Sequence, residues 1–378
     1  VYPDTPSCAY VTSLLRMAAL LHDVGHGPFG HFFDEHFLRQ YGLTHETLGA
    51  QIIVDELGDL LRSLRRNPSG ALEDGETLEP GQIAWLIQRP TTATESAEWP
   101  GWLSHLRALL SGIYTVDNMD FVLRDAYMSG YNQRSVDVDR LLHYSFFSAA
   151  GLTIHDRGLD TLVQFMGVRA ELFRTIYFHR TVRAIDLTLK DLFEESREHL
   201  FPGDPREHLD EYQAFTEASL FTDVRRWMSH SNPAKQTLGT RWNRLLAREI
   251  SWRMASQVNL VFGESDHESA SIFSDSDLVE QKLRQRLGAT ASDIPLRIDI
   301  ARHIHRPHTR GPVSGQNFLY DSSQDQVRPL ATHELFSRMP ISYRICRAYV
   351  QEKAHVQPVA FALESLVKGP GSDDLTNM

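Results

Sequence analysis

The sequence predicts a mostly α-helical protein with a smaller α+β part at its C-terminal end. Apolar residues recur at helical spacing over residues 9–22 and over residues 167–195, the clearest long helical pattern in the chain. Segments rich in β-branched and aromatic residues come late, namely LRIDIARHIH, NFLYD and SYRICRAYV. We therefore expect helices to dominate up to residue 262 and strands to mix with helices beyond it.

The N-terminal elements follow from local signals. The helix over residues 9–22 ends where GHGP, residues 25–28, breaks its pattern. A helix restarts over residues 29–40, and Thr44 has the position of an N-cap for the helix after it. Residues 66–82 have the turn-forming composition of a loop.

The middle of the chain is mainly helical by the same criteria. Residues 89–102 have the composition of a second long loop, and helical periodicity resumes over residues 103–130. The segments LTIHDRG and DTLVQF, within residues 152–165, are expected to form a small hairpin. Further helices are expected over residues 211–262.

The composition is that of an ordinary globular protein. Of 378 residues, 42% are hydrophobic and 23% are charged. No apolar run approaches the length of about 18 residues that a membrane span needs, and no secretory signal is visible. The two cysteines fit a reducing compartment, so we expect a cytoplasmic protein with no membrane partner. The net charge of −11 argues against broad coating of nucleic acid, although a local basic groove stays open.

The stretch LLHDVGHGPFGHFFDEHFL, residues 20–38, gathers four histidines and three acids at the end of an apolar helix. Buried imidazoles and carboxylates are costly unless they are paired or bound to a metal. His22 and Asp23 are neighbours at the helix end, and their nitrogen and oxygen donors suit a first-row divalent metal. A capping aspartate beside a core histidine is the alternative for the isolated pair.

Further titratable pairs follow along the chain. His31 and Asp34 are three residues apart, so they can meet on one helix face, where the carboxylate would fix the tautomer of the imidazole. His45 and Glu46 follow as a second histidine–acid pair.

The segment VDNMDFVLRD places three carboxylates, Asp117, Asp120 and Asp125, on an otherwise apolar helix. Asp117 and Asp120 are three residues apart and can face one site. Asp120 can equally pair with Arg124 four residues on, as an ordinary helix-face ion pair.

The motifs LLHDVGHGPFGH, HE and DNMDFVLRD, in this order, resemble the HD-domain phosphohydrolase superfamily. Their spacing is similar to that of bacterial deoxynucleoside triphosphate triphosphohydrolases and of the SAM-and-HD-domain dNTP hydrolase of vertebrates. LFRTIYFHRTVRAID, residues 172–186, resembles the long substrate-side helix of that branch. The resemblance implies an HD-domain helical bundle over residues 1–200, followed by a helical extension over 201–265 and an α+β region over 266–378.

The resemblance also implies the chemical roles of the titratable residues. It makes His22, Asp23 and Asp117 ligands of a divalent metal ion, which can be Mn, Mg, Fe, Co, Ni or Zn. It places three histidines around the scissile phosphate, with two carboxylates that orient His31, the residue expected to protonate the leaving oxygen or handle the attacking water. These catalytic candidates are His26, His31, Asp34, His45 and Glu46.

The same resemblance implies a set of substrate-binding residues. Asp125 matches the acid that binds the sugar 3′-hydroxyl, and Tyr177 matches the aromatic residue that packs on the sugar. Arg174 and Arg180 are the expected phosphate contacts.

Two departures from the family pattern bear on these roles. In the family the first histidine of the metal signature lies upstream of the His-Asp pair, whereas no histidine precedes His22 here. We expect that histidine on a helix before residue 1; the alternative is an incomplete site. The residue after the ligand aspartate is usually basic and touches phosphate, and here it is Asn118, while Phe121 replaces the usual tyrosine of the pocket. Asn118 and Phe121 are therefore two further substrate-binding candidates. Both replacements weaken the triphosphate prediction and leave the metal chemistry unchanged.

The favoured function is therefore hydrolysis of a dNTP to deoxynucleoside and tripolyphosphate by a metal-dependent enzyme. A metal-dependent phosphodiesterase or nuclease, acting on nucleic acid or another nucleotide, is the alternative from Asn118 and Phe121. A nucleotide-binding module with a degenerate site is the third. By analogy with relatives, a homo-oligomer is expected.

Overall fold

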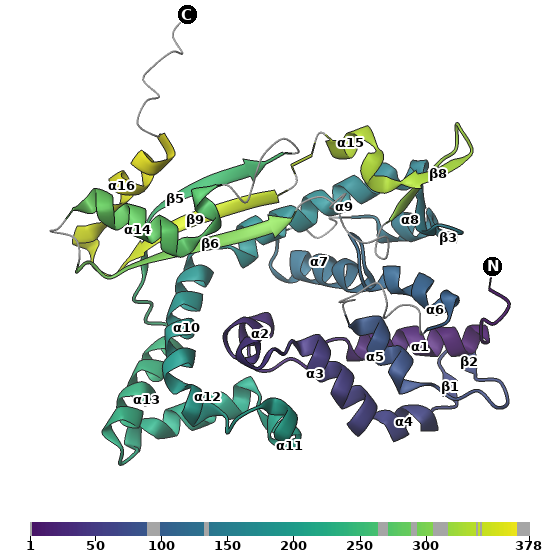
Figure 1. Cartoon of the computed structure of the whole chain (residues 1–378), viewed down its shortest axis with the longest axis horizontal. Coiled ribbons are helices and arrows are strands. Elements are labelled where there is room, and N and C mark those ends of the chain that lie inside the picture. Colours follow the sequence, from purple (N-terminus) through teal and green to yellow (C-terminus); the bar gives the residue numbers. More distant parts are fainter. Residues whose placement is uncertain are drawn as a thin grey trace, which may run out of the picture. The chain divides into compact units, whose positions relative to one another are not determined.

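The computed structural model describes residues 2–88, 99–131, 136–263, 271–288, 293–304, 317–337, 339–340 and 342–368 (Figure 1). It confirms the predicted fold class, a mostly helical protein with a helical N-terminal part and a smaller strand-containing C-terminal part. None of the helices in these ranges is long and apolar enough to cross a membrane.

The chain divides into two compact units that interleave along the sequence. Unit 1 comprises Val1–Val168, Phe193–Arg226 and Pro307–His333, and unit 2 comprises Arg169–Leu192, Trp227–Arg306 and Glu334–Met378. The three consecutive segments expected from the sequence stay a prediction.

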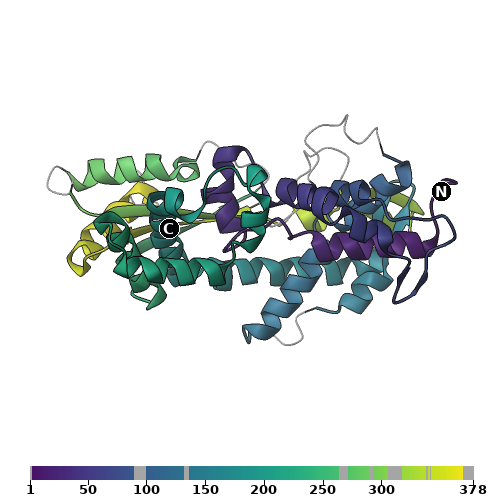
Figure 2. The ribbon, with the colours of Figure 1, turned by 90° about the horizontal axis from the view of Figure 1, so that it is seen from below.

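Unit 1 is mainly helical. In chain order it contains α1 (Cys8–Leu21), α2 (His31–His36), α3 (His45–Gln51), α4 (Gly58–Ser63), α5 (Pro80–Ile87), α6 (Gly101–Leu106), α7 (Val116–Met128), α8 (Val138–His143), α11 (Leu209–Ala214) and α12 (Glu217–Arg226). Figure 2 shows these helices from below, with α1 in purple near the N-terminus. The helix expected over residues 9–22 is α1, and the loop expected over residues 89–102 lies outside the described residues except at its end, where α6 begins.

Helix α1 supplies the core against which the site is built. It begins after Ser7, whose hydroxyl accepts a hydrogen bond from the backbone N–H of Tyr10. Its apolar face buries Leu14 and Ala18 in a cluster that also holds Ile53 from the π-helical turn Ile52–Glu56 and Ile83 from α5. This packing fixes the direction in which the C-terminal end of α1 leaves the core.

A four-stranded sheet completes unit 1. Its strands are β3 (Ser145–Ser148), β4 (Gly151–His155), β7 (Phe318–Asp321) and β8 (Gln326–Pro329), in the order β3-β4-β7-β8, with β4 and β7 parallel. The hairpin predicted within residues 152–165 is wrong, because β4 pairs with β3 and β7 and DTLVQF lies in α9 (Leu159–Leu172). Apolar residues at helical spacing along α9, Leu162, Phe165 and Met166, are buried, which explains the helix. A second short hairpin, β1 (Arg66–Asn67) with β2 (Gly70–Ala71), lies in the segment expected as a loop.

Unit 2 is built on a three-stranded antiparallel sheet. The strands β5 (Arg253–Phe262), β9 (Ser342–Val350) and β6 (Leu296–Ile304) lie in the order β5-β9-β6. The helices α14 (Ser276–Leu287) and α16 (Val356–Lys368) pack their apolar residues against one face, including Leu283 and Leu363. Of the segment 211–262, which was expected to be helical, the last helix is α13 (Pro233–Leu246). The helical prediction for 253–262 is wrong, because this segment pairs with β9 along its length.

The long helix expected over residues 167–195 is interrupted. Helix α9 runs into a π-helical turn, Phe173–Tyr177, and α10 (Arg180–Leu200) begins after it. The backbone N–H of Phe178 bonds to the carbonyl of Phe173, five residues earlier, which widens the turn. Such bulges are frequent at functional sites, and this one contains two of the predicted substrate residues.

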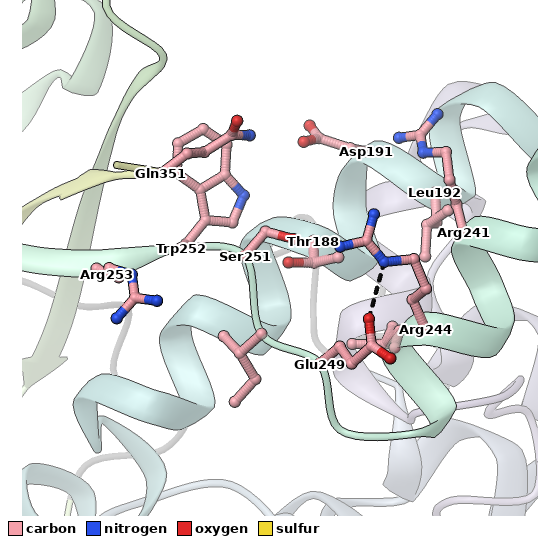
Figure 3. A pocket seen from close by; sticks show the side chains of 12 residues that line it. Thr188, Asp191, Leu192, Arg241, Arg244, Glu249, Ser251, Trp252, Arg253 and Gln351 are labelled. Carbon is pink, nitrogen blue, oxygen red and sulfur yellow. Dashed lines mark hydrogen bonds and ion pairs between the residues drawn. The ribbon is translucent and has the colours of Figure 1, made fainter. Parts of the chain in front are cut away.

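A pocket of about 520 Å³ lies within unit 2 (Figure 3). Its lining includes Trp252, Arg241 and Arg244, and the Arg244 guanidinium donates to Glu249 at 2.9 Å. None of the residues predicted for the catalytic site lines it.

Candidate metal and phosphate site

The end of α1 delivers the first two predicted metal ligands. His22 is the residue that caps the C-terminus of α1, and its Nδ1 lies 2.9 Å from the carbonyl oxygen of Ala19. A carbonyl can only accept, so Nδ1 donates a hydrogen bond to it and Nε2 is the nitrogen left to face Asp23 and Asp117. Asp23 follows as the helix ends.

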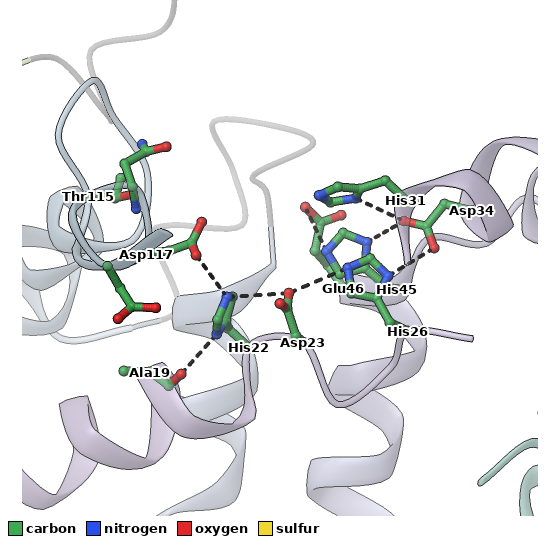
Figure 4. A network of polar contacts seen from close by, with 12 residues as sticks. Ala19, His22, Asp23, His26, His31, Asp34, His45, Glu46, Thr115 and Asp117 are labelled. Carbon is green, nitrogen blue, oxygen red and sulfur yellow. Dashed lines mark hydrogen bonds and ion pairs between the residues drawn. The ribbon is translucent and has the colours of Figure 1, made fainter. Parts of the chain in front are cut away.

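Helix α7 carries the third predicted ligand, Asp117. Thr115 caps this helix by accepting from the backbone N–H of Asn118 at 3.0 Å, which places Asp117 in the first turn. His22 Nε2 lies 3.3 Å from Asp23 Oδ1 and 3.5 Å from Asp117 Oδ1 (Figure 4). The structure therefore brings together the three predicted metal ligands from two elements far apart in sequence.

The two carboxylates of this group favour a positive charge next to them. The interaction with the Asp117 carboxylate raises the pKa of His22 to about 9, outweighing the lowering by burial. Nε2 is itself buried, and among the described residues no well-aligned hydrogen bond satisfies it. One imidazole nitrogen and two carboxylate oxygens that converge in this way fit a first-row divalent metal ion.

A cluster of three histidines surrounds Asp34 next to this group (Figure 4). His26 Nδ1 lies 3.5 Å from Asp34 Oδ1, and His31 Nδ1 lies 3.7 Å from Asp34 Oδ2. His45 Nδ1 forms a short hydrogen bond to Asp34 Oδ2, and the His45 ring stacks on the His26 ring at 3.8 Å between centroids. Asp34 thus contacts all three predicted histidines, and the contact described for Glu46 is with His45 Nε2 at 3.9 Å.

The carboxylates determine the protonation of this cluster. Burial acts to lower the pKa of His26, but Asp23 and Asp34 outweigh it and raise that pKa to about 9. The pKa of Asp34 is raised by burial and lowered more by the three histidines, so it lies well below its usual range. His26 Nε2 lies 3.5 Å from Asp23 Oδ1, which connects the histidine cluster with the predicted metal ligands.

The histidine cluster is a second set of possible metal donors. His26, His31, Asp34 and His45 offer ligand atoms that all lie within 4.8 Å of one another. The resemblance implies proton transfer and phosphate contact for these residues, not metal binding. The His26–His31 spacing together with His45 could have indicated a second metal site, but this pattern fits metal binding and proton transfer equally.

The backbone of the GHGPFGH motif, residues 25–31, is unusual. A Cβ on Gly25 would lie 2.1 Å from the carbonyl oxygen of His45, so only glycine fits there. Phe29 has φ of 68° and Gly30 has φ of 58°. The left-handed conformation costs a residue with a side chain about 1 kcal/mol, so Phe29 is under strain.

Among the predicted substrate residues, three lie on α7 in unit 1. Asn118 is buried, Phe121 is half-buried, and Asp125 Oδ1 lies 3.5 Å from Arg124 Nε. Arg124 also forms a short ion pair with Asp120, as expected for the helix-face alternative.

The other three predicted substrate residues lie in unit 2. Arg174 and Tyr177 belong to the π-helical turn, and Arg180 is the first residue of α10. The Arg174 guanidinium lies 5.1 Å from the Tyr343 ring centroid, and the Arg180 carbonyl accepts from the Tyr349 hydroxyl at 2.8 Å. Their role in binding a substrate of the unit 1 site stays a prediction.

Comparison with known proteins gives a consistent result. Residues 12–83 match the family model described as HD domain. The chain is 25% identical over 185 residues to the uncharacterized protein YwfO of Bacillus subtilis, covering 49% of this chain and 37% of that protein. It is 27% identical over 199 residues to the deoxynucleoside triphosphate triphosphohydrolase SAMHD1 of Gallus gallus, covering 48% of this chain and 32% of that protein. The chain thus spans about a third of the length of these relatives.

A solved structure supports the fold. A hypothetical protein from Aquifex aeolicus superposes with a TM-score of 0.65 at 18% identity, covering 93% of this chain and 79% of that one. The family match over residues 12–83, which includes the His22–Asp23 pair, shows that this part of the chain is an HD domain.

Proposed function

We propose that the protein hydrolyses dNTPs to deoxynucleoside and tripolyphosphate with the help of a divalent metal ion. The observation that carries the proposal is the convergence of His22, Asp23 and Asp117 beside the three histidines around Asp34. The similarity to proteins named deoxynucleoside triphosphate triphosphohydrolases supports the choice of substrate class.

His22, Asp23 and Asp117 would hold the metal ion, whose identity among Mn, Mg, Fe, Co, Ni and Zn is open. When bound, such an ion neutralises charge on phosphoryl oxygens and lowers the pKa of water. Two carboxylates and one imidazole are a donor set that would hold any of these ions.

The histidine cluster would handle the phosphoryl group and the protons. His26 is held protonated between Asp23 and Asp34, so it can donate to a phosphoryl oxygen. The side chain of His31 is 78% exposed, and Asp34 holds it from one side. As water adds to the α-phosphorus and the bond to the 5′-oxygen breaks, His31 is placed to protonate that oxygen.

The remaining roles follow from the same proposal. Asp125 would bind the sugar 3′-hydroxyl, Tyr177 would pack on the sugar, and Arg174 and Arg180 would contact the phosphates. A homo-oligomeric state and a cytoplasmic location belong to the proposal as well.

The first test is product analysis with each dNTP and Mn²⁺, Mg²⁺ or Co²⁺. Ion-exchange chromatography should show tripolyphosphate and deoxynucleoside, and Asp23→Ala should abolish both because it removes a carboxylate from the metal group. Release of pyrophosphate or orthophosphate instead, or unchanged activity in the variant, would contradict the proposal.

A phosphodiesterase or nuclease is the second candidate. It is favoured by Asn118, which is buried and uncharged where triphosphohydrolases carry a basic residue. Cleavage of labelled single-stranded DNA or RNA, without tripolyphosphate release from dNTPs, would select this candidate.

A further inference from the structure

The loop that carries His26 and His31 is contacted by a segment far along the chain. Helices α11 and α12 lie outside residues 12–83, which match the HD domain, yet both belong to unit 1 and both bond to the backbone of residues 25–31. We propose that Tyr212 and Glu217 are positioning residues, which hold this loop so that His26 and His31 keep their places around Asp34. The proposal rests on the proposed function for its catalytic consequence.

Tyr212 holds the start of the loop. Its side chain lies in the core, with the residue only 3% exposed, and its hydroxyl donates to the carbonyl oxygen of Gly25 at 2.8 Å. Gly25 immediately precedes His26 and is pressed against the backbone of His45, so one hydrogen bond fixes the peptide next to two of the histidines. Burial raises the pKa of the Tyr212 hydroxyl well above its usual range, so it stays a donor.

Glu217 holds the strained turn of the loop. It is the first residue of α12, and its Oε1 accepts the backbone N–H of Phe29 at 2.7 Å. A carboxylate acceptor makes this hydrogen bond stronger than a neutral one. The hydrogen bond holds Phe29, the residue with a positive φ. The Phe29 ring is in turn packed against Phe193 at 5.9 Å and Phe221 at 5.8 Å between centroids.

The two anchored backbone positions, Gly25 and Phe29, are close in sequence to both histidines. His26 lies between them, and His31 follows Phe29 by two residues at the start of α2. Their contacts to Asp34, at 3.5 and 3.7 Å, are already at the limit of an ion pair. A backbone shift of about 1 Å would separate them, and misplacement on that scale can cost an enzyme orders of magnitude in rate.

Two substitutions with matched controls test Glu217. Glu217→Ala removes the acceptor, Glu217→Gln keeps an oxygen that accepts the same N–H, and Asp223→Ala alters an exposed acid on the same helix. Hydrogen–deuterium exchange of a peptide covering residues 25–31 should accelerate in Glu217→Ala and stay as in the wild type in the other two. With dNTP and Mn²⁺, kcat should fall about tenfold in Glu217→Ala with KM little changed, and Glu217→Gln should restore it.

Tyr212→Phe tests the second anchor, because it removes only the hydroxyl. Tyr127→Phe, at an exposed position of α7, is its control. The accelerated exchange should be confined to residues 25–31 and accompanied by a loss of kcat. Exchange that rises throughout unit 1 with a lower melting temperature, or a loop that exchanges as in the controls, would overturn the positioning role.

The exchange measurement does not depend on the reaction. If the wild-type protein releases no tripolyphosphate, the proposed function fails, and faster exchange of residues 25–31 in Glu217→Ala still supports the anchors. If the wild type is active and both Glu217→Ala and Tyr212→Phe match their controls in exchange and kcat, the inference fails and the proposed function stands.

Discussion

At the scale of single residues, two carboxylates that each contact more than one histidine determine the charge state of the site. Asp23 lies near both His22 and His26, and Asp34 contacts three imidazoles, so each acid holds more than one base. The same sharing lowers the pKa of both acids and raises that of His26. The result is a set of charges that stabilise one another when no metal or phosphate is bound.

This charge pattern predicts how the stability of the metal-free protein depends on pH. The pKa of His26 rises from an unfolded value of about 6.5 to about 9 on folding. Its contribution is therefore fully present below the unfolded value and is lost as the pH rises through the folded one. With EDTA present, the melting temperature of the wild type should decrease as the pH is raised from about 6.5 to about 9.

His26→Gln is the variant that isolates this effect. Because glutamine does not titrate, the variant should show a shallower fall in melting temperature over the same pH range. Parallel curves for the two proteins would mean that His26 does not carry a raised pKa.

At the scale of elements, the ends of two helices position two of the proposed metal ligands. Asp117 lies in the first turn of α7, where the Thr115 cap orders the backbone, and His22 is the C-cap residue that directly follows α1. Thr115→Ala should lower the free energy of unfolding by about 1 kcal/mol, because the N–H of Asn118 loses its acceptor. Thr115→Ser keeps a hydroxyl and should stay close to the wild type. Denaturant unfolding measures the difference, and equal stability of the two variants would contradict the capping role.

The elements also show what the sequence can and cannot predict. Helix α1, the N-cap Thr44 and the strands β6, β7 and β9 were predictable, because each depends on periodicity or on a local hydrogen bond. Strand β5 was not, since its ten residues become a strand by pairing with β9 far along the chain. The interruption of the long helix at Phe173 is likewise set by a five-residue hydrogen bond that periodicity does not report.

At the scale of the whole molecule, distant segments complete the site. The grouping of His22, Asp23 and Asp117 was predictable because the resemblance identifies them by type and order, and the fold brings them together; their role as metal ligands stays a prediction. The contacts of Tyr212 and Glu217 with the loop of residues 25–31 were not predictable, because no motif links residues so far apart. Unit 1 is assembled from three stretches of chain, which explains why the boundary expected at residue 200 could not reveal these contacts.

The most direct test of the account is metal binding by two aspartate variants of α7. Asp117→Asn removes a proposed ligand, whereas Asp120→Asn changes an exposed acid on the same helix that pairs with Arg124. Titration calorimetry with Mn²⁺ should show that Asp117→Asn loses at least about tenfold in affinity, as loss of a charged ligand requires, and that Asp120→Asn binds like the wild type. Equal Mn²⁺ affinity in Asp117→Asn and the wild type would contradict the assignment of the metal site.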